Sequence, residues 1–152
     1  MIVLAHSWQS LRDTFPGRRL EWAAATMLTL LGIVFFLNED MFAGSNAWQH
    51  MAEFWPQYVW AWGCAAVGSA RLITLVVNGA FSRSPHARAV LAFISCFGWY
   101  QLTVGLLPNL AIGAAIFPVL LFFDAGVALQ VIKEAGLAEA QIERTKKSGT
   151  SS

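Results

Sequence analysis

The sequence predicts an all-α integral membrane protein, a four-transmembrane-helix bundle with short interfacial helices. Three observations lead to this prediction: four long apolar runs, few charged residues, and basic residues confined to alternate links between the runs. Of the 152 residues, 57% are hydrophobic and 12% are charged, and the mean hydropathy is +0.54, which is far from the balance of a soluble domain. The lipid bilayer is therefore the first expected partner.

Each apolar run is long enough to cross the hydrocarbon core of a membrane. The runs cover residues 20–37, 58–77, 89–107 and 110–132, and a helix needs about 20 residues to cross about 30 Å. The first run follows a segment that contains Arg12, Arg18 and Arg19, and no A-x-A-like site comes after it. We therefore expect it to be retained rather than cleaved as a signal peptide, so that residues 1–132 form a single membrane domain.

The distribution of Lys and Arg predicts the orientation of the bundle. Basic residues occur before the first run, between the second and third, and after the fourth, and Arg71 is the exception inside a run. The link at residues 38–57 contains Glu39, Asp40 and Glu53 but no basic residue. Because cytoplasmic segments have the excess of Lys and Arg, four spans place both termini in the cytoplasm.

Local signals predict two of the helix ends. Asn78-Gly79 is typical of a C-cap and would end the second helix. Ser84 as an N-cap, followed by Pro85 at the first helical position, would begin the third helix. The link between these two helices is then a tight loop.

Two shorter amphipathic segments are expected to lie along the membrane surfaces. Residues 2–15 have an apolar stripe at helical spacing, and residues 46–55 repeat this spacing before Pro56, a pattern typical of interfacial helices. The sequence does not distinguish between two interpretations of these segments, contact with lipid and packing on the helix bundle. Residues 133–152 form a cytoplasmic tail that can extend the fourth helix to Arg144, after which we expect disorder.

Two opposite charges lie inside the predicted spans. Arg71 is roughly 9 Å from the cytoplasmic end of the second run, and Asp124 is roughly 12 Å from that of the fourth. Each costs about 2.5–3.5 kcal/mol near a helix centre unless pairing, snorkelling or water offsets it. We therefore expect an Arg71–Asp124 ion pair. It either fixes which helices touch or belongs to a proton or ion path.

Three further polar residues are expected to support this pair or the bundle. Asn78 shares the helical face of Arg71, and Gln130 is expected to reach the same polar funnel from the fourth helix. Gln101 lies near the middle of the third run, where an interhelical hydrogen bond is the favoured interpretation.

The second and fourth runs also contain residues that shape helix packing. Pro118 is expected to kink the fourth helix six residues before Asp124. Small residues allow helix backbones to approach closely, either within the fold or between copies in a homo-oligomer. On the second run these are Ala61, Cys64, Ala65, Gly68 and Ser69.

Several functional classes are disfavoured by the sequence. The thinly spread basic residues do not form the face that nucleic acid requires. Cys64 and Cys96 and the three histidines lack the spacing of a metal site or disulfide framework, so no metal or cofactor is expected. No catalytic signature occurs, and the extramembrane segments are too short for a catalytic domain. We therefore expect that the protein is not an enzyme.

Four stretches, "FPGRRLEW", "RLITLVVNG", "SPHARAVLAFISCFGW" and "FPVLLFFD", span the chain from Phe15 to Asp124. Their pattern resembles small four-span membrane proteins encoded by tailed phages and prophages. This resemblance implies a bacterial inner membrane and a role in host lysis or envelope modification. The first hypothesis is a holin-like protein that perturbs the envelope by self-association. The alternatives are an accessory or superinfection-exclusion protein that binds another membrane protein, and a small channel or transporter that uses Arg71 and Asp124.

Overall fold

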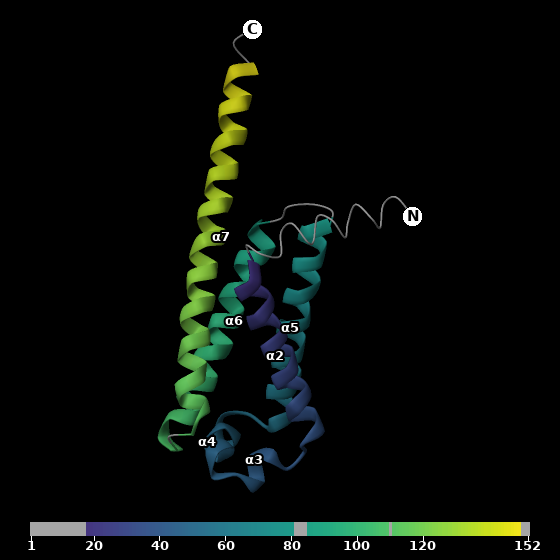
Figure 1. Ribbon diagram of the computed structural model, residues 1–152, viewed down its shortest axis with the longest axis vertical. Coiled ribbons are helices and arrows are strands. Elements are labelled where there is room, and N and C mark those ends of the chain that lie inside the picture. The colour runs from purple at the N-terminus through teal and green to yellow at the C-terminus, as the bar shows by residue number, and fades with distance from the viewer. Residues whose placement is uncertain (1–17, 81–84, 110, 150–152) are drawn as a thin grey trace, which may run out of the picture.

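The chain folds into helices joined by short connections (Figure 1). The computed structural model describes residues 18–80, 85–109 and 111–149. Four helices are long and apolar enough to cross a membrane: α2 (Arg19–Leu37), α5 (Gln57–Ala80), α6 (Pro85–Leu106) and α7 (Gly113–Gly149). The predicted helical class and the four candidate spans are thus confirmed for this part of the chain. The interfacial helix predicted at residues 2–15 lies outside the described residues.

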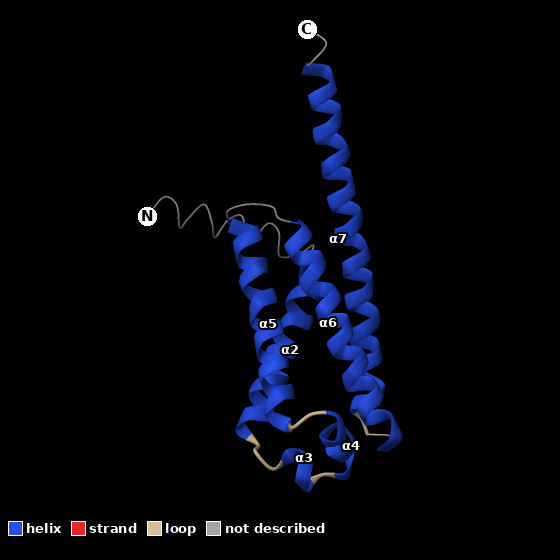
Figure 2. Ribbon diagram, turned by 180° about the vertical axis from the view of Figure 1, so that it is seen from behind, coloured by secondary structure: helices blue, strands red, loops and turns tan. Residues whose placement is uncertain are grey.

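The four long helices are arranged as two antiparallel pairs. α2 packs mainly on α5, and α6 packs mainly on α7 (Figures 1 and 2). The first pair approaches closely at Gly32, where an added Cβ would lie 2.5 Å from the backbone nitrogen of Ala65 and 2.8 Å from the carbonyl oxygen of Ala61. Contacts between the two pairs are fewer, so the residues that join them decide how the bundle closes.

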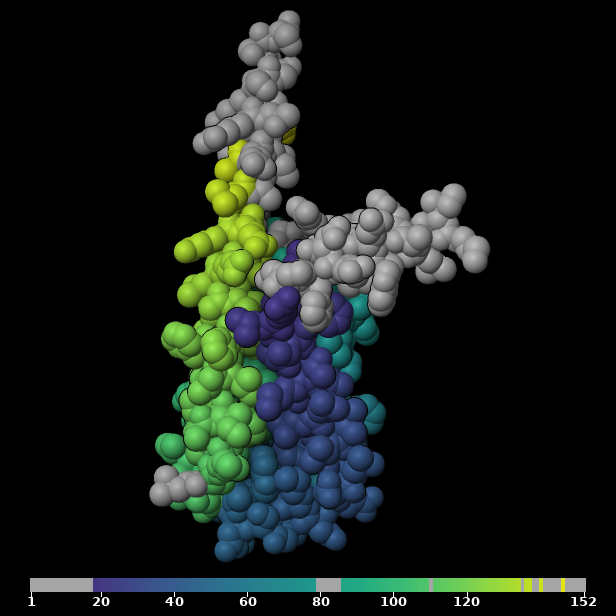
Figure 3. Space-filling model, viewed as in Figure 1, coloured from purple at the N-terminus to yellow at the C-terminus, as the bar shows by residue number. Residues whose placement is uncertain are grey.

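Short helices cover the end of the bundle opposite the basic residues. α3 (Met41–Gly44), α4 (Asn46–Phe54) and the 3-10 turn η2 (Leu107–Asn109) lie there, and the space-filling view shows this region as a continuous mass below the long helices (Figure 3). Gln57 ties the segment together: its Nε2 donates to the carbonyl oxygens of Phe35 at 2.7 Å and Asn38 at 2.5 Å, and its Oε1 accepts from the Phe42 amide at 3.0 Å.

The segment predicted at residues 46–55 packs on the bundle. Met51 of α4 is fully buried and lies against Gly105 of α6, while Phe42 and Trp48 stack at 5.7 Å between ring centroids. Asn109 donates hydrogen bonds to the carbonyl oxygens of Asn46 and Ala47. Between the two interpretations left open by the sequence, these contacts favour packing on the bundle.

Two helices extend beyond their predicted ends. The C-cap predicted at Asn78-Gly79 is wrong because α5 continues to Ala80; a glycine costs a helix only about 1 kcal/mol relative to alanine, which does not by itself end it. The disorder predicted after Arg144 is wrong for residues 145–149, because α7 continues to Gly149. The tail contains three residues each of Ala, Glu and Lys, which are strong helix formers.

The turn between the third and fourth helices and the environment of Arg88 also differ from the prediction. α7 begins at Gly113 rather than at residue 110, because η2 and the residues after it form a wider connection. α6 begins at Pro85, the position predicted for the first helical residue, although Ser84 lies outside the described residues. Arg88 is therefore inside the helix, where it is buried, and not in a solvated link.

Candidate functional site

Arg71 and Asp124 meet inside the bundle. The Arg71 guanidinium on α5 holds the Asp124 carboxylate on α7 with two bonds, Nη1 to Oδ2 at 2.5 Å and Nη2 to Oδ1 at 2.8 Å. The two side chains are 4% and 1% exposed. Such parallel bonds between guanidinium and carboxylate are the strongest form of a side-chain ion pair. This ion pair therefore links α5, which packs on α2, to α7, which packs on α6.

Two residues of α6 complete the hydrogen bonding of this ion pair. Ser95 Oγ accepts from Arg71 Nη1 at 2.7 Å and donates to Asp124 Oδ2 at 2.5 Å, and the Trp99 indole Nε1 donates to the same Oδ2 at 2.9 Å. Ser95 and Trp99 are fully buried. None of these side chains has a buried polar atom without a partner. The two opposite charges balance each other, and their hydrogen bonds are made within the chain.

Sequence reasoning did not identify Ser95 and Trp99. They lie four residues apart on α6, and therefore on one helical face. This spacing of a hydroxyl and an indole was the available signal. Gln101, the residue of this helix predicted to form an interhelical hydrogen bond, lies on a different face and lines an apolar cavity between α5 and α6.

The two residues predicted to support the ion pair, Asn78 and Gln130, differ in burial. Asn78 is buried near the end of α5. Gln130 is exposed, and its Nε2 donates to Glu134 Oε1 at 3.5 Å one turn away on α7. The prediction that Gln130 reaches the polar funnel around Arg71 is therefore wrong, because the rotation of α7 that points Asp124 inward points Gln130 outward.

The small residues of α5 pack within the fold. Ala61 and Ala65 lie against Gly32 of α2, and Gly68 lies against the backbone and hydroxyl of Thr29. Of the other two predicted packing residues, Cys64 is buried and Ser69 is half-buried. Ala61, Ala65 and Gly68 accordingly join α5 to α2, which is packing within the fold, the first of the two possibilities that the sequence left open.

Pro118 lies inside α7, which remains helical on both sides of it. Because proline has no backbone N–H, it leaves the carbonyl of the residue four positions earlier without its helical donor. The kink predicted here stays a prediction.

A second charged cluster lies nearer the basic end of the bundle. Arg88 of α6 binds Glu21 of α2 through Nε to Oε2 at 3.2 Å and Nη2 to Oε1 at 2.5 Å, and its Nη1 contacts Glu134 Oε2 of α7 at 3.3 Å. Glu21 and Arg88 are each 8% exposed. This cluster also joins the two helix pairs. Sequence reasoning missed it because Glu21 was counted within an apolar run and Arg88 within a loop.

A small polar cavity separates the two clusters. Its volume is about 10 Å³, and its lining includes Glu21, Arg71, Thr74 and Arg88. This is close to the smallest volume that holds one water molecule between polar groups. The two charged clusters are thus neighbours in a single polar region that reaches from the basic end to Asp124.

Removing Arg88 should cost far more stability than removing its half-exposed partner. We expect Arg88→Ala to lower the free energy of unfolding by about 1.5–3 kcal/mol, because buried Glu21 loses two charge-assisted hydrogen bonds. Glu134, whose side chain is 47% exposed, should cost under about 1 kcal/mol when replaced by alanine. Unfolding in mixed micelles measures both variants, and equal losses would contradict this ranking.

The arrangement of these residues is that of a closed ionic network. Among the described residues, no three His, Cys, Asp or Glu side chains are grouped so that they could hold a metal ion. No protein-family model matches the sequence, and the searches of curated proteins and of solved structures return no match.

Proposed function

We propose that this chain is a multi-pass bacterial inner-membrane protein with a non-catalytic accessory role, and that it binds another protein through the part of α7 beyond the bundle. The observation that supports this is the length of α7. The candidate span within it ends at Glu134, which contacts Arg88 of α6, but the helix continues to Gly149. Residues 135–149 extend roughly 22 Å further, and α7 rises past the other helices (Figures 1 and 3).

This extension is the part of the chain best suited to a protein partner. Leu137 is 69% exposed and lies outside the span, where water rather than lipid would surround it in an unpartnered protein. Helices gain most of their stability from packing an apolar face rather than from propensity alone. A partner that covers Leu137 would supply this packing.

The orientation proposed for the extension follows from the charges at the two ends of the bundle. Arg19, Arg88 and Lys133 lie on the long helices at the end from which α7 extends. Glu39, Asp40 and Glu53 belong to the opposite, α3–α4 end. The excess of basic residues favours the cytoplasm for the first end, so the proposed partner is a cytoplasmic protein or the cytoplasmic part of a membrane protein.

The other functions considered have less support. The holin-like hypothesis relied on the small residues of α5, but three of them, Ala61, Ala65 and Gly68, pack on α2, so this face is already occupied there within one copy. A channel or transporter would need a route past the ion pair, whereas Trp99, which donates to Asp124, and Leu102 and Leu106 on the same helix are fully buried. Both hypotheses, and the resemblance to phage proteins, stay predictions.

Photo-crosslinking tests the accessory role. With a benzophenone amino acid at Leu137, we expect an adduct with one specific protein in the native membrane. The matched control places it at Leu129, which is 63% exposed but within the span, where lipid should be the main adduct. Deleting residues 135–152 should abolish the binding of the identified protein and leave the bundle folded.

Two outcomes would contradict this function. A crosslinked product at twice the mass of the 16.6 kDa chain would show self-association and favour the holin-like hypothesis, as would loss of membrane potential on induction. The absence of any protein adduct at Leu137 would remove the extension as a binding element.

A further inference from the structure

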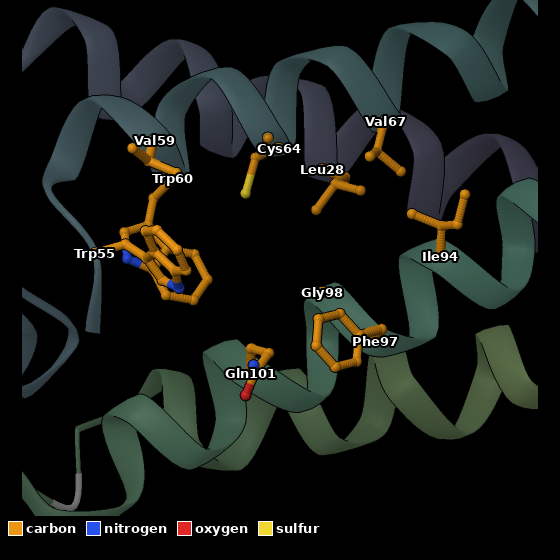
Figure 4. Close-up of a pocket in the computed structure, with 11 residues that line it drawn as sticks. Leu28, Trp55, Val59, Trp60, Cys64, Val67, Ile94, Phe97, Gly98 and Gln101 are labelled. Carbon is orange, nitrogen blue, oxygen red and sulfur yellow. The ribbon is translucent and has the colours of Figure 1, made fainter.

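An apolar cavity lies between α5 and α6, backed by α2. Its volume is about 210 Å³, larger than the cavity of about 150 Å³ that is known to hold a benzene molecule. Cys64 and Leu28 lie on one side of it, and Phe97 and Gln101 lie on the other (Figure 4). The cavity therefore has room for a slender apolar group, whereas an α-helix, with a diameter of about 10–12 Å, is too wide for it.

Two glycines keep this cavity open. Gly63 on α5 and Gly98 on α6 both line it, and a Cβ added to either would meet nothing within 4 Å. Beyond the deep end, Arg71 joins α5 to Ser95 and Asp124, and at the other end Trp60 donates from its indole to the Met51 carbonyl at 3.4 Å. These contacts set the spacing of the helices, so the cavity does not collapse.

The polarity of the lining changes along the bundle axis. Gln101 and Trp55 lie at the α3–α4 end, and Val67 and Ile94 lie at the deep end (Figure 4). Val67 is roughly 15 Å along α5 from its first residue, which is about half the thickness of a hydrocarbon core. The cavity thus extends from one membrane surface to about the midplane, which is the depth of one leaflet.

Gln101 supplies the side-chain amide at the surface end. Within the described parts of the chain its side chain forms no hydrogen bond, which leaves an amide donor and acceptor at the mouth of an apolar cavity. A buried or half-buried amide is stabilised by a partner. The rim residues Ile94 and Phe97 are exposed, so the cavity opens onto the surface that would face hydrocarbon.

We propose that this cavity binds one acyl chain of a bilayer phospholipid from the leaflet on the α3–α4 side, with the ester carbonyl of that lipid accepting a hydrogen bond from Gln101. The chain occupies the space between Gly63 and Gly98 and ends near Val67. The depth, the apolar lining and the position of the single amide match a lipid that enters from the membrane surface. This site is separate from the extension of α7 and does not depend on the accessory role.

Leucine substitutions that fill the cavity test this site. The purified wild type and three variants, Gly63→Leu, Gly98→Leu and Gly126→Leu, are titrated with dioleoyl phosphatidylglycerol, and bound lipids are counted by native mass spectrometry. Gly126 on α7 is the matched control, because it also has open space around it and does not line the cavity. All three changes remove a helical glycine, so the gain in helix propensity is shared.

We expect one tightly held lipid on the wild type and on Gly126→Leu, and at least tenfold weaker binding to Gly63→Leu and Gly98→Leu. Because the two filling variants act from opposite walls, either one suffices if the other fails to fold. Gln101→Leu should weaken binding about threefold to tenfold through loss of one hydrogen bond, and no change would overturn the assigned role of Gln101.

Three results would overturn the lipid site itself. One is equal lipid binding by all four proteins, and another is a wild type that retains no lipid. The third is a wild-type dimer that Gly98→Leu dissociates, because the cavity would then hold a side chain of a second copy.

Discussion

Asp124→Ala is expected to destabilise the protein more than any other single change, by about 3–5 kcal/mol. The substitution leaves the Arg71 guanidinium, which is 4% exposed, without its counter-charge, and leaves the Trp99 indole without an acceptor. For a protein of ordinary stability, about 5–15 kcal/mol, this is at least a fifth of the total. The midpoint of unfolding in mixed micelles measures the loss.

A matched control separates burial from charge. Asp40 is exposed and its side chain forms no cap hydrogen bond at the start of α3, so Asp40→Ala should change stability little. If Asp124→Ala were as stable as Asp40→Ala, the pair would not be a structural element. A variant that stayed folded but lost proton or ion conduction shown by the wild type would instead support the proton or ion path.

Exchanging the two charges should restore only part of this stability. In Arg71→Asp with Asp124→Arg, the ions can still attract each other, but the Trp99 N–H would then face a guanidinium rather than a carboxylate. Donor would meet donor, and an unpaired buried donor costs about 1–3 kcal/mol. Full recovery in the exchanged protein would show that the contribution of Trp99 is small.

Gly32→Leu is expected to have the second largest effect. A Cβ at this position would lie 2.5–2.8 Å from backbone atoms of Ala61 and Ala65, and backbone cannot move aside as a flexible side chain can. α2 and α5 must therefore separate. The expected loss of stability is greater than the about 1–3 kcal/mol that overpacking of a core usually costs. Gly126→Leu on α7, where open space surrounds the glycine, is the control in the same unfolding assay. Similar midpoints for the two variants would mean that the α2–α5 contact yields easily.

The prediction of the four spans was possible because it depends on properties that are local in sequence. Run length and hydropathy set which segments are long enough to cross a bilayer, and the absence of Lys and Arg from residues 38–57 separates the acidic end from the basic end. Helical rise alone placed Arg71 and Asp124 at a similar depth. Their meeting followed from the cost of leaving either charge unpaired in an apolar bundle.

The partners around that pair depend on how the helices rotate and cross. Ser95 and Trp99 contact Asp124 because α6 packs beside α7 in this register, and Gln130 faces outward for the same reason. Arg88 was misplaced because its burial requires Glu21 from a helix far away in sequence.

Residue pattern alone predicted four apolar spans, the shared depth of Arg71 and Asp124, and the small residues that allow a close helix contact. The packed bundle was needed to show that Ala61, Ala65 and Gly68 face α2, that two ionic clusters join the helix pairs, and that a cavity remains between α5 and α6. The physical reason is that period and hydropathy define the faces of a helix, whereas the helix that each face meets depends on packing across the whole bundle.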